Sequence, residues 1–136
     1  MPVRVLIVED ECFVAADICE TIEDGGYVCA GIADDTASAM QLASPDVDIA
    51  LVDVNLCDGA TGPMIGELLS REYGIKVIFV TANPAQLGGG VPGTLGVVTK
   101  PADVPLIDQV LDYALRRDST PTPTPPPGFV AFAHAA

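Results

Sequence analysis

Positive charge is scarce in this chain: its 136 residues include 6 Lys and Arg against 19 Asp and Glu, which gives a formal charge of -13. Such an excess of negative charge repels phosphate backbones and anionic membrane surfaces. Long apolar segments are also missing, since no stretch approaches the roughly 20 residues of a membrane-spanning helix. The first apolar run meets Glu9 too early for a signal sequence. These absences argue against direct nucleic-acid binding and membrane insertion, and they indicate a cytoplasmic protein.

Sites built on thiols are not signalled either. The four cysteines, at positions 12, 19, 29 and 57, have no Cys-x-x-Cys spacing, and the single histidine is His134 near the end of the chain. This pattern predicts neither a zinc site nor a disulfide framework. We expect the thiols to be buried or inert.

What the chain does contain is a regular alternation of two patterns. Short apolar runs typical of strands lie at residues 3–8, 27–33, 48–52, 76–80 and 95–98. Helical patterns follow them at residues 11–24, 36–43 and 63–73, and again from about Asp103. The length suits a single domain, and the alternation is typical of an α/β protein with a parallel sheet.

Two segments break the alternation. Residues 83–93 are rich in glycine, and each interior Gly costs a helix about 1 kcal/mol relative to Ala, so the fourth helix is predicted to be short or disordered. The regular domain is expected to span residues 1–118. Residues 119–136 begin with a Pro- and Thr-rich stretch and are predicted to be a disordered tail. The alternative is a docking peptide in which exposed Phe129 and Phe132 fill a groove.

Polar side chains stand where four of the apolar runs end. They are Glu9 and Asp10 after the first run, Asp53 after the third, Thr81 after the fourth and Lys100 after the fifth. The carboxyl ends of parallel strands share one edge of a sheet, and ligands bind at that edge. The four positions are therefore expected to converge on one site.

The chemistry of this set favours a metal ion and a phosphoryl group. Three carboxylates in close quarters repel one another unless a cation joins them, and Mg²⁺ prefers such oxygen ligands. Asp53 can then act as a nucleophile toward phosphorus. Lys100 would meet one phosphoryl oxygen as a point charge, and Thr81 would donate its hydroxyl to another.

Each of these residues has a simpler explanation when it is taken alone. An acidic residue after a strand is often a helix cap, and a lone Lys100 would be a solvated surface charge. Their joint appearance, in order and each at a strand end, favours the site. The small Ala82 after Thr81 would leave room for the incoming group.

Residues 3–117 resemble the receiver domain of two-component response regulators. The resemblance is carried by four motifs: Val8-Glu9-Asp10-Glu11, Leu51-Val52-Asp53-Val54-Asn55, Thr81-Ala82 and Thr99-Lys100-Pro101. It implies a doubly wound, flavodoxin-like (βα)5 fold with five parallel strands in the order 2-1-3-4-5. It also implies a single-domain response regulator that acts in signal transduction.

The resemblance implies a role for each site residue. Glu9, through water, would hold Mg²⁺ together with Asp10, Asp53 and the backbone carbonyl of Asn55. Asp53 would accept the phosphoryl group from a histidine of a sensor kinase or a histidine phosphotransferase. A cis peptide before Pro101 would aim Lys100 into the site. The protein would catalyse only its own phosphorylation and dephosphorylation, and the kinase would be recognised on the first helix, around Phe13, Val14 and Asp17.

The chain departs from the usual receiver pattern in two places. Val97 replaces the aromatic residue that swings inward on phosphorylation, and the glycines at 88–90 replace the fourth helix. Both features, with the Thr-Ala-x-Pro-x-x-Leu pattern of residues 81–87, are similar to atypical alphaproteobacterial receivers, including those of the anti-anti-sigma general stress regulators. We expect the state of the site to be reported by an unusual route. One hypothesis is that the Gly-rich segment becomes ordered on phosphorylation.

Several uses of this chain remain open at this point. With no effector domain expected, output would pass by protein contact to an unidentified target, either by relaying the phosphoryl group or by allosteric binding. A haloacid dehalogenase-type phosphatase also uses an aspartyl nucleophile and Mg²⁺, but it needs an Asp where Asn55 stands, and its nucleophile ends the first strand. A phosphate-independent binding module with a receiver-like fold is the third possibility.

Overall fold

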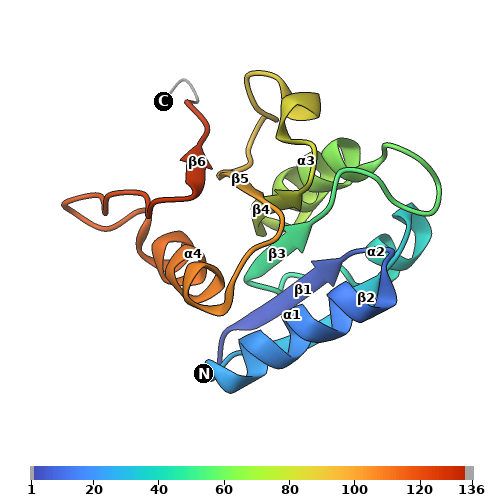
Figure 1. Ribbon diagram of the computed structural model, residues 1–136, viewed down its shortest axis with the longest axis horizontal. Coiled ribbons are helices and arrows are strands. Elements are labelled where there is room, and N and C mark those ends of the chain that lie inside the picture. The colour runs from blue at the N-terminus through green and yellow to red at the C-terminus, as the bar shows by residue number, and fades with distance from the viewer. Residues whose placement is uncertain (1, 134–136) are drawn as a thin grey trace.

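A six-stranded sheet forms the centre of the protein (Figure 1). The structure is a computed structural model that describes residues 2–133, so His134 and the end of the predicted tail lie outside the described residues. The spatial order of the strands is β2-β1-β3-β4-β5-β6; five are parallel, and β6 runs antiparallel to β5. Their bounds are β1 Arg4–Val8, β2 Val28–Ala33, β3 Ile49–Val52, β4 Lys76–Thr81, β5 Gly96–Thr99 and β6 Phe129–Ala131.

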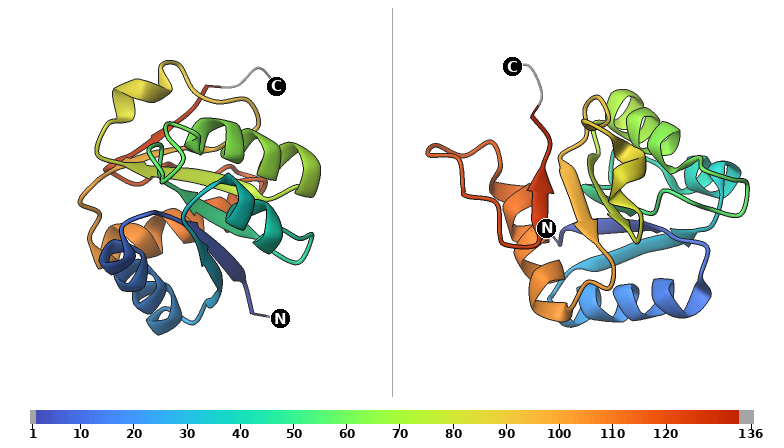
Figure 2. Two further views of the ribbon diagram at one scale, coloured as in Figure 1. Left: turned by 90° about the vertical axis from the view of Figure 1, so that its right-hand side faces the viewer. Right: turned by 45° about the horizontal axis from the view of Figure 1, so that its top comes forward.

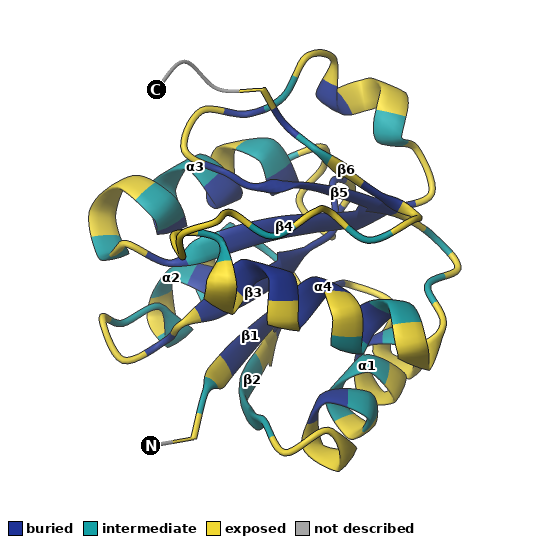
Figure 3. Cartoon of the chain, turned by 90° about the vertical axis from the view of Figure 1, so that its left-hand side faces the viewer, coloured by how far each residue is buried: buried dark blue, intermediate teal, exposed yellow. Residues whose placement is uncertain are grey.

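Helices cover both faces of the sheet. Figure 2 shows α1 (Cys12–Asp24) and α4 (Val104–Arg116) on one face and α2 (Thr36–Leu42) and α3 (Gly62–Tyr73) on the other. Because both faces are covered, side chains of β1 alternate between two cores: Leu6 and Val8 enter the α2–α3 core, and Val5 and Ile7 enter the α1–α4 core. This explains why the strands are apolar throughout rather than alternating (Figure 3). The predicted doubly wound α/β fold is confirmed.

The segment after β4 contains one turn of 3₁₀ helix, η1 (Pro84–Leu87), in place of a full helix. It stops at Gly88, whose φ of 55° lies in the left-handed region, and Gly90 follows with a φ of 124°. The prediction of a short fourth helix is therefore confirmed. The hypothesis that this segment becomes ordered on phosphorylation stays a prediction.

The C-terminal segment differs from the prediction of a disordered tail. Residues 119–128 form no helix or strand and are mostly exposed, as expected, but Phe129–Ala131 form β6, a sixth strand on the β5 edge. Phe129 and Phe132 are only 6% and 9% exposed, so they are not the exposed aromatics of a free docking peptide. Burial of two rings together with strand pairing outweighs the entropy of ordering a short segment, a gain that composition alone did not reveal.

The four cysteines are free, and none of them is fully buried. Cys12 and Cys57 are exposed, while Cys19 and Cys29 are half-buried. Burial raises the pKa of Cys19 to about 12, and the neighbouring Cys29 and Glu23 add to the rise, which makes this thiol a poor nucleophile. Of the thiols expected to be buried or inert, Cys12 and Cys57 are not buried, and their inertness stays a prediction. In the part of the chain that is described, residues 2–133, no helix has the length and apolar character to span a membrane.

Candidate phosphoacceptor and metal site

The sheet brings all the predicted polar positions to one edge. Backbone hydrogen bonds continue past the strand ends: Asp53 N donates to Val8 O at 2.9 Å, and Lys100 N donates to Thr81 O at 2.9 Å. Asp10, Asp53, Thr81, Ala82 and Lys100 therefore line one cleft of about 270 Å³, together with Glu11, Asn55 and Asn83. The convergence expected from the parallel strands is present.

Three carboxylates form the acidic part of the site. Glu9, Asp10 and Asp53 each offer an oxygen, and these oxygens lie within 4.8 Å of one another. Glu9 is almost fully buried, and Asp53 is 9% exposed, while Asp10 reaches into solvent. Three carboxylates at this separation, one of them open to water, are a donor set that suits a hard divalent cation that keeps some of its waters. The residues present therefore fit Mg²⁺.

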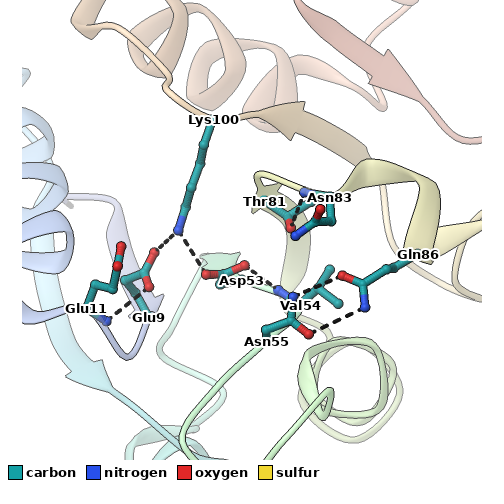
Figure 4. A network of polar contacts seen from close by, with 9 residues as sticks. All are labelled: Glu9, Glu11, Asp53, Val54, Asn55, Thr81, Asn83, Gln86 and Lys100. Atoms are coloured by element: carbon teal, nitrogen blue, oxygen red, sulfur yellow. Dashed lines mark hydrogen bonds and ion pairs between the residues drawn. The ribbon is translucent and has the colours of Figure 1, made fainter.

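Lys100 is the cation that balances the cluster (Figure 4). Its Nζ donates to Asp53 Oδ2 at 2.8 Å and also to Glu9 Oε1. Burial by itself lowers the pKa of Lys100, but the hydrogen bonds to Asp53 and Glu9 hold that pKa above its ordinary value. Burial raises the pKa of Glu9, and the hydrogen bond from Lys100 offsets part of the rise. One positive charge is thus shared by two buried carboxylates. The Lys100–Pro101 peptide bond is cis.

The Asp53 carboxylate is held by the backbone N–H of the next residue as well as by Lys100. Its Oδ1 accepts a hydrogen bond from Val54 N at 2.7 Å, and its Oδ2 accepts from Lys100. The first turn of α3 packs directly behind it: a Cβ on Gly62 would overlap the Asp53 carbonyl oxygen and lie 2.6 Å from Val54 Cα. Gly62 therefore positions the carboxylate-bearing turn. A glycine just before Pro63 at a helix start is the sequence signal that could have indicated this role.

Thr81 stands at the end of β4 with a fully buried side chain. Its Oγ1 accepts a hydrogen bond from Asn83 N at 3.1 Å, so the hydroxyl also fixes the start of the segment that contains η1. Ala82 between them is exposed and lines the cleft.

A side-chain pair joins the site to η1. Asn55 Nδ2 donates to Gln86 Oε1 at 2.9 Å, and Gln86 Nε2 donates back to Asn55 Oδ1 at 3.5 Å (Figure 4). Asn55 lies two residues after Asp53, and Gln86 lies in the 3₁₀ turn. The local sequence gives no signal for this pair, because residues 31 positions apart meet only through the fold.

The loop after Asp53 is anchored to α2. Asp58 Oδ2 accepts from the backbone N and the hydroxyl of Thr36 at 3.1 and 2.7 Å, and Asp58 Oδ1 accepts from Thr61 Oγ1 at 2.6 Å. These hydrogen bonds, that of the Thr36 hydroxyl first, lower the pKa of Asp58 to about 2. Asp58 is a second residue that sequence reasoning missed.

Val97, at the position of the usual switch aromatic, is buried in β5. It pairs with Val130 of β6 and belongs to the same core as Phe132. Two buried aromatic rings share this core with Val97: Phe79 of the paired strand β4 and Phe132 of the C-terminal segment.

The chain belongs to the family of response regulator receiver domains, because residues 5–112 match the model of the response regulator receiver domain. Among curated proteins it is similar to the phyllosphere-induced regulator PhyR of Methylorubrum extorquens, with 30% identity over 118 residues. That match covers 85% of this chain and 44% of PhyR, so the chain spans less than half the length of this relative.

Among solved structures, the chain is also similar to PhyR proteins. The receiver domain of PhyR from Erythrobacter litoralis superposes with a TM-score of 0.77 at 28% identity, covering 90% of this chain and 97% of that one. PhyR from Bartonella quintana, described as an anti-anti-sigma factor, gives a TM-score of 0.75 at 27% identity, covering 88% of this chain and 50% of that one. The chain is therefore similar to the receiver part of PhyR proteins.

Proposed function

We propose that this receiver accepts a phosphoryl group on Asp53 from a phosphohistidine of a sensor histidine kinase or a histidine phosphotransferase, in a Mg²⁺-dependent reaction. The observation that supports this most directly is the arrangement around Asp53. Its carboxylate is held by Lys100 and Val54 N, and two further carboxylates lie within reach of a shared cation.

In the transfer, an oxygen of Asp53 attacks phosphorus, the phosphorus–nitrogen bond to the donor histidine breaks, and the imidazole leaves with that electron pair. Mg²⁺, held by Asp10, Asp53, the Asn55 carbonyl and Glu9 through water, would offset the negative charge of the phosphoryl oxygens. Lys100 exchanges a carboxylate partner for a phosphoryl oxygen, and Thr81 donates its hydroxyl to another. Beyond this self-phosphorylation and its reversal by hydrolysis, we propose no enzymatic activity.

The donor protein would dock beside the cleft on α1. Phe13 is 87% exposed there, although it is a large apolar side chain. Val14 and Ile18 of α1 line an adjoining cleft of about 410 Å³ that reaches Ala82 and Pro101. An apolar surface next to the phosphoacceptor suits a helix that carries the phosphohistidine.

Phosphorylation with a small acyl phosphate tests the proposal. Incubation with Mg²⁺ and acetyl phosphate should add one phosphoryl group to the wild-type chain and none to Asp53→Ala, as measured by intact mass. Asp46→Ala is the matched control, because Asp46 is exposed in the turn before β3, at the opposite end of the strands from the site. No mass gain in the wild type would instead support a phosphate-independent binding module. Steady hydrolysis of unrelated phosphate esters would support a haloacid dehalogenase-type phosphatase.

Output is proposed to pass by protein contact. A receiver can relay its phosphoryl group to a further histidine or bind a target in its phosphorylated state. Transfer from the labelled chain to a histidine phosphotransferase would favour the relay, and a stable complex formed only by the phosphorylated chain would favour allosteric binding.

A further inference from the structure

The strand β6 covers the β5 edge of the sheet in the same way that a bound extended peptide would. Beside β5, β6 pairs Gly96 with Ala131, Val97 with Val130 and Val98 with Phe129 (Figure 3). One further backbone hydrogen bond, from Phe132 N to Leu95 O at 2.9 Å, extends this pairing. Addition of an extended segment to an exposed sheet edge is a common mode of peptide recognition.

The ring of Phe129 occupies a closely fitting space on the α1–α4 face of the sheet, which we call its seat. Its centroid lies 5.2 Å from that of Tyr113. The seat exists because residue 96 is glycine: a Cβ there would lie 2.5 Å from Phe129 Cζ and would also overlap the backbone oxygen of Val130. Any side chain at position 96 would therefore close the seat.

The ring of Phe132 has a second seat on the opposite face. It packs in the α2–α3 core with Leu87 and Val91, at a centroid distance of 6.3 Å from Phe79. Gly90 makes room for it, since a Cβ at that position would lie 2.9 Å from Phe132 Cγ. Together the two seats select an antiparallel segment with aromatic side chains three residues apart, one for each face.

The segment that fills these seats is loosely tethered. It is joined to α4 by residues 117–128, which form no helix or strand and are mostly exposed. The β5–β6 ladder is short, with three residue pairs and the one further hydrogen bond of Phe132 N, and Val130 between the two rings is 64% exposed. A strand joined through a linker of this kind can leave the sheet edge and return to it at a high effective concentration, because the linker keeps it nearby.

The Phe132 seat is connected to the phosphoacceptor site. Asn55 pairs with Gln86 of η1, and Thr81 Oγ1 accepts from Asn83 N at the start of the same segment. Leu87, the next residue of η1, packs in the core that contains Phe132. Phosphorylation of Asp53 would engage the Thr81 hydroxyl, which also fixes the start of the η1 segment. Bound Mg²⁺ would engage the backbone carbonyl of Asn55, whose side chain pairs with Gln86 of η1. Because Gly90 packs closely against the ring of Phe132, a shift of the η1 segment would disturb the packing of that ring.

We propose that the β5 edge is a docking site for an extended partner segment with aromatic residues three apart. Residues 128–133 occupy this site in cis, and phosphorylation of Asp53 weakens their hold. This inference rests on the proposed function, and it gives that function an output surface.

Amide hydrogen exchange on the full chain tests the cis occupant. With Mg²⁺ and beryllofluoride as the phosphoryl mimic, the Phe132 amide should exchange about tenfold faster, while the amides of β1 stay unchanged. Unchanged or slower exchange at Phe132 would overturn the proposal. Phosphorylation is measured in parallel by intact mass: a chain that takes no phosphoryl group refutes the proposed function, whereas a chain that takes it without a change at Phe132 refutes only this inference.

A peptide that copies residues 126–133, labelled with fluorescein, tests the docking site in trans. It should bind the variant Phe129→Ser/Phe132→Ser at least about tenfold more tightly than the wild type, because the wild-type tail competes at high effective concentration. Val130→Ser, which changes an exposed residue of the same strand, should behave like the wild type. Equal binding to all three chains, or to none, would overturn the proposal.

The wild type alone also decides the question if the double variant fails to fold. Beryllofluoride with Mg²⁺ should then raise the affinity of the peptide for the wild-type chain. No change in affinity would count against the proposal. Conversion of the chain to a dimer under the same conditions, measured by light scattering, would show that the freed edge takes the strand of a second copy and would overturn the assignment to a partner segment.

Discussion

At the scale of single residues, the site is organised by the sharing of one cation. Lys100 contacts both Glu9 and Asp53, and each contact involves a carboxylate with little access to water. A buried charge without a partner is strongly unfavourable, so the cluster holds together only while this lysine or a metal ion balances it. This explains why the predicted polar residues indicate a site when they occur together, whereas each of them alone does not.

The metal-binding role of Asp10 can be measured without any phosphoryl donor. A ligand that binds only the native state stabilises it, by about 2.7 kcal/mol at a hundred times its Kd. Mg²⁺ should therefore raise the melting temperature of the wild-type chain, and Asp10→Ala should abolish the rise. Asp46→Ala should retain it. A rise of equal size in Asp10→Ala would show that Mg²⁺ acts elsewhere on the chain.

The close approach at Gly62 gives a second prediction for a single residue. Gly62→Ala forces a methyl group onto the backbone of Asp53 and Val54, so the free energy of unfolding should fall by about 1–3 kcal/mol. The same variant should be phosphorylated more slowly by acetyl phosphate. Gly89→Ala is the control, since a Cβ at Gly89 meets nothing within 4 Å. Urea unfolding that gives equal stability for both variants would contradict this account.

At the scale of elements, the β3–α3 loop positions the site, because hydrogen bonds join this loop to neighbouring elements. The β3–α3 loop is held to α2 through Asp58, and to η1 through the Asn55–Gln86 pair. These contacts fix the backbone around Asp53 from two sides. The short η1 compensates in part for the missing helix, and Phe132 of the C-terminal segment completes the core beside it.

The anchoring by Asp58 predicts a pH dependence. Its pKa is lowered to about 2 in the folded chain, from an unfolded value of about 4. The stabilisation is therefore fully present above about pH 4 and is lost as the pH falls toward 2. Asp58→Asn should unfold at a lower urea concentration than the wild type at pH 7, and the difference should shrink below pH 4. A difference that is constant with pH, or as large in Asp46→Asn, would be evidence against this anchor.

At the scale of the whole molecule, net charge is the dominant feature. A formal charge of -13 on 136 residues makes the folded chain repel itself. Salt screens this repulsion over a Debye length of about 8–10 Å near physiological ionic strength. The melting temperature should therefore rise as NaCl is increased from about 0.01 to 0.15 M, measured without Mg²⁺. A fall would mean that the ion pairs stabilise the chain more than the net charge destabilises it.

The sequence by itself determined the parallel sheet and the convergence of polar residues at its edge. Strand and helix alternation is a local pattern, and β3 and β4 were predicted to within one residue of their observed bounds. The polar residues that end the strands follow from the same pattern, because parallel strands necessarily share an edge. The short segment after Thr81 was equally predictable, since a run of glycines disfavours a helix regardless of its neighbours.

Only the tertiary structure decided which distant residues meet. The Asn55–Gln86 pair and the contacts of Asp58 join residues with no signal in their local sequence. That Gly62 leaves space for Asp53 is likewise visible only in the folded chain. The C-terminal strand is the clearest case. Its composition indicates a disordered tail, and it is ordered because Gly90 and Gly96, far from it in sequence, leave room for its two aromatic rings on opposite faces of the sheet.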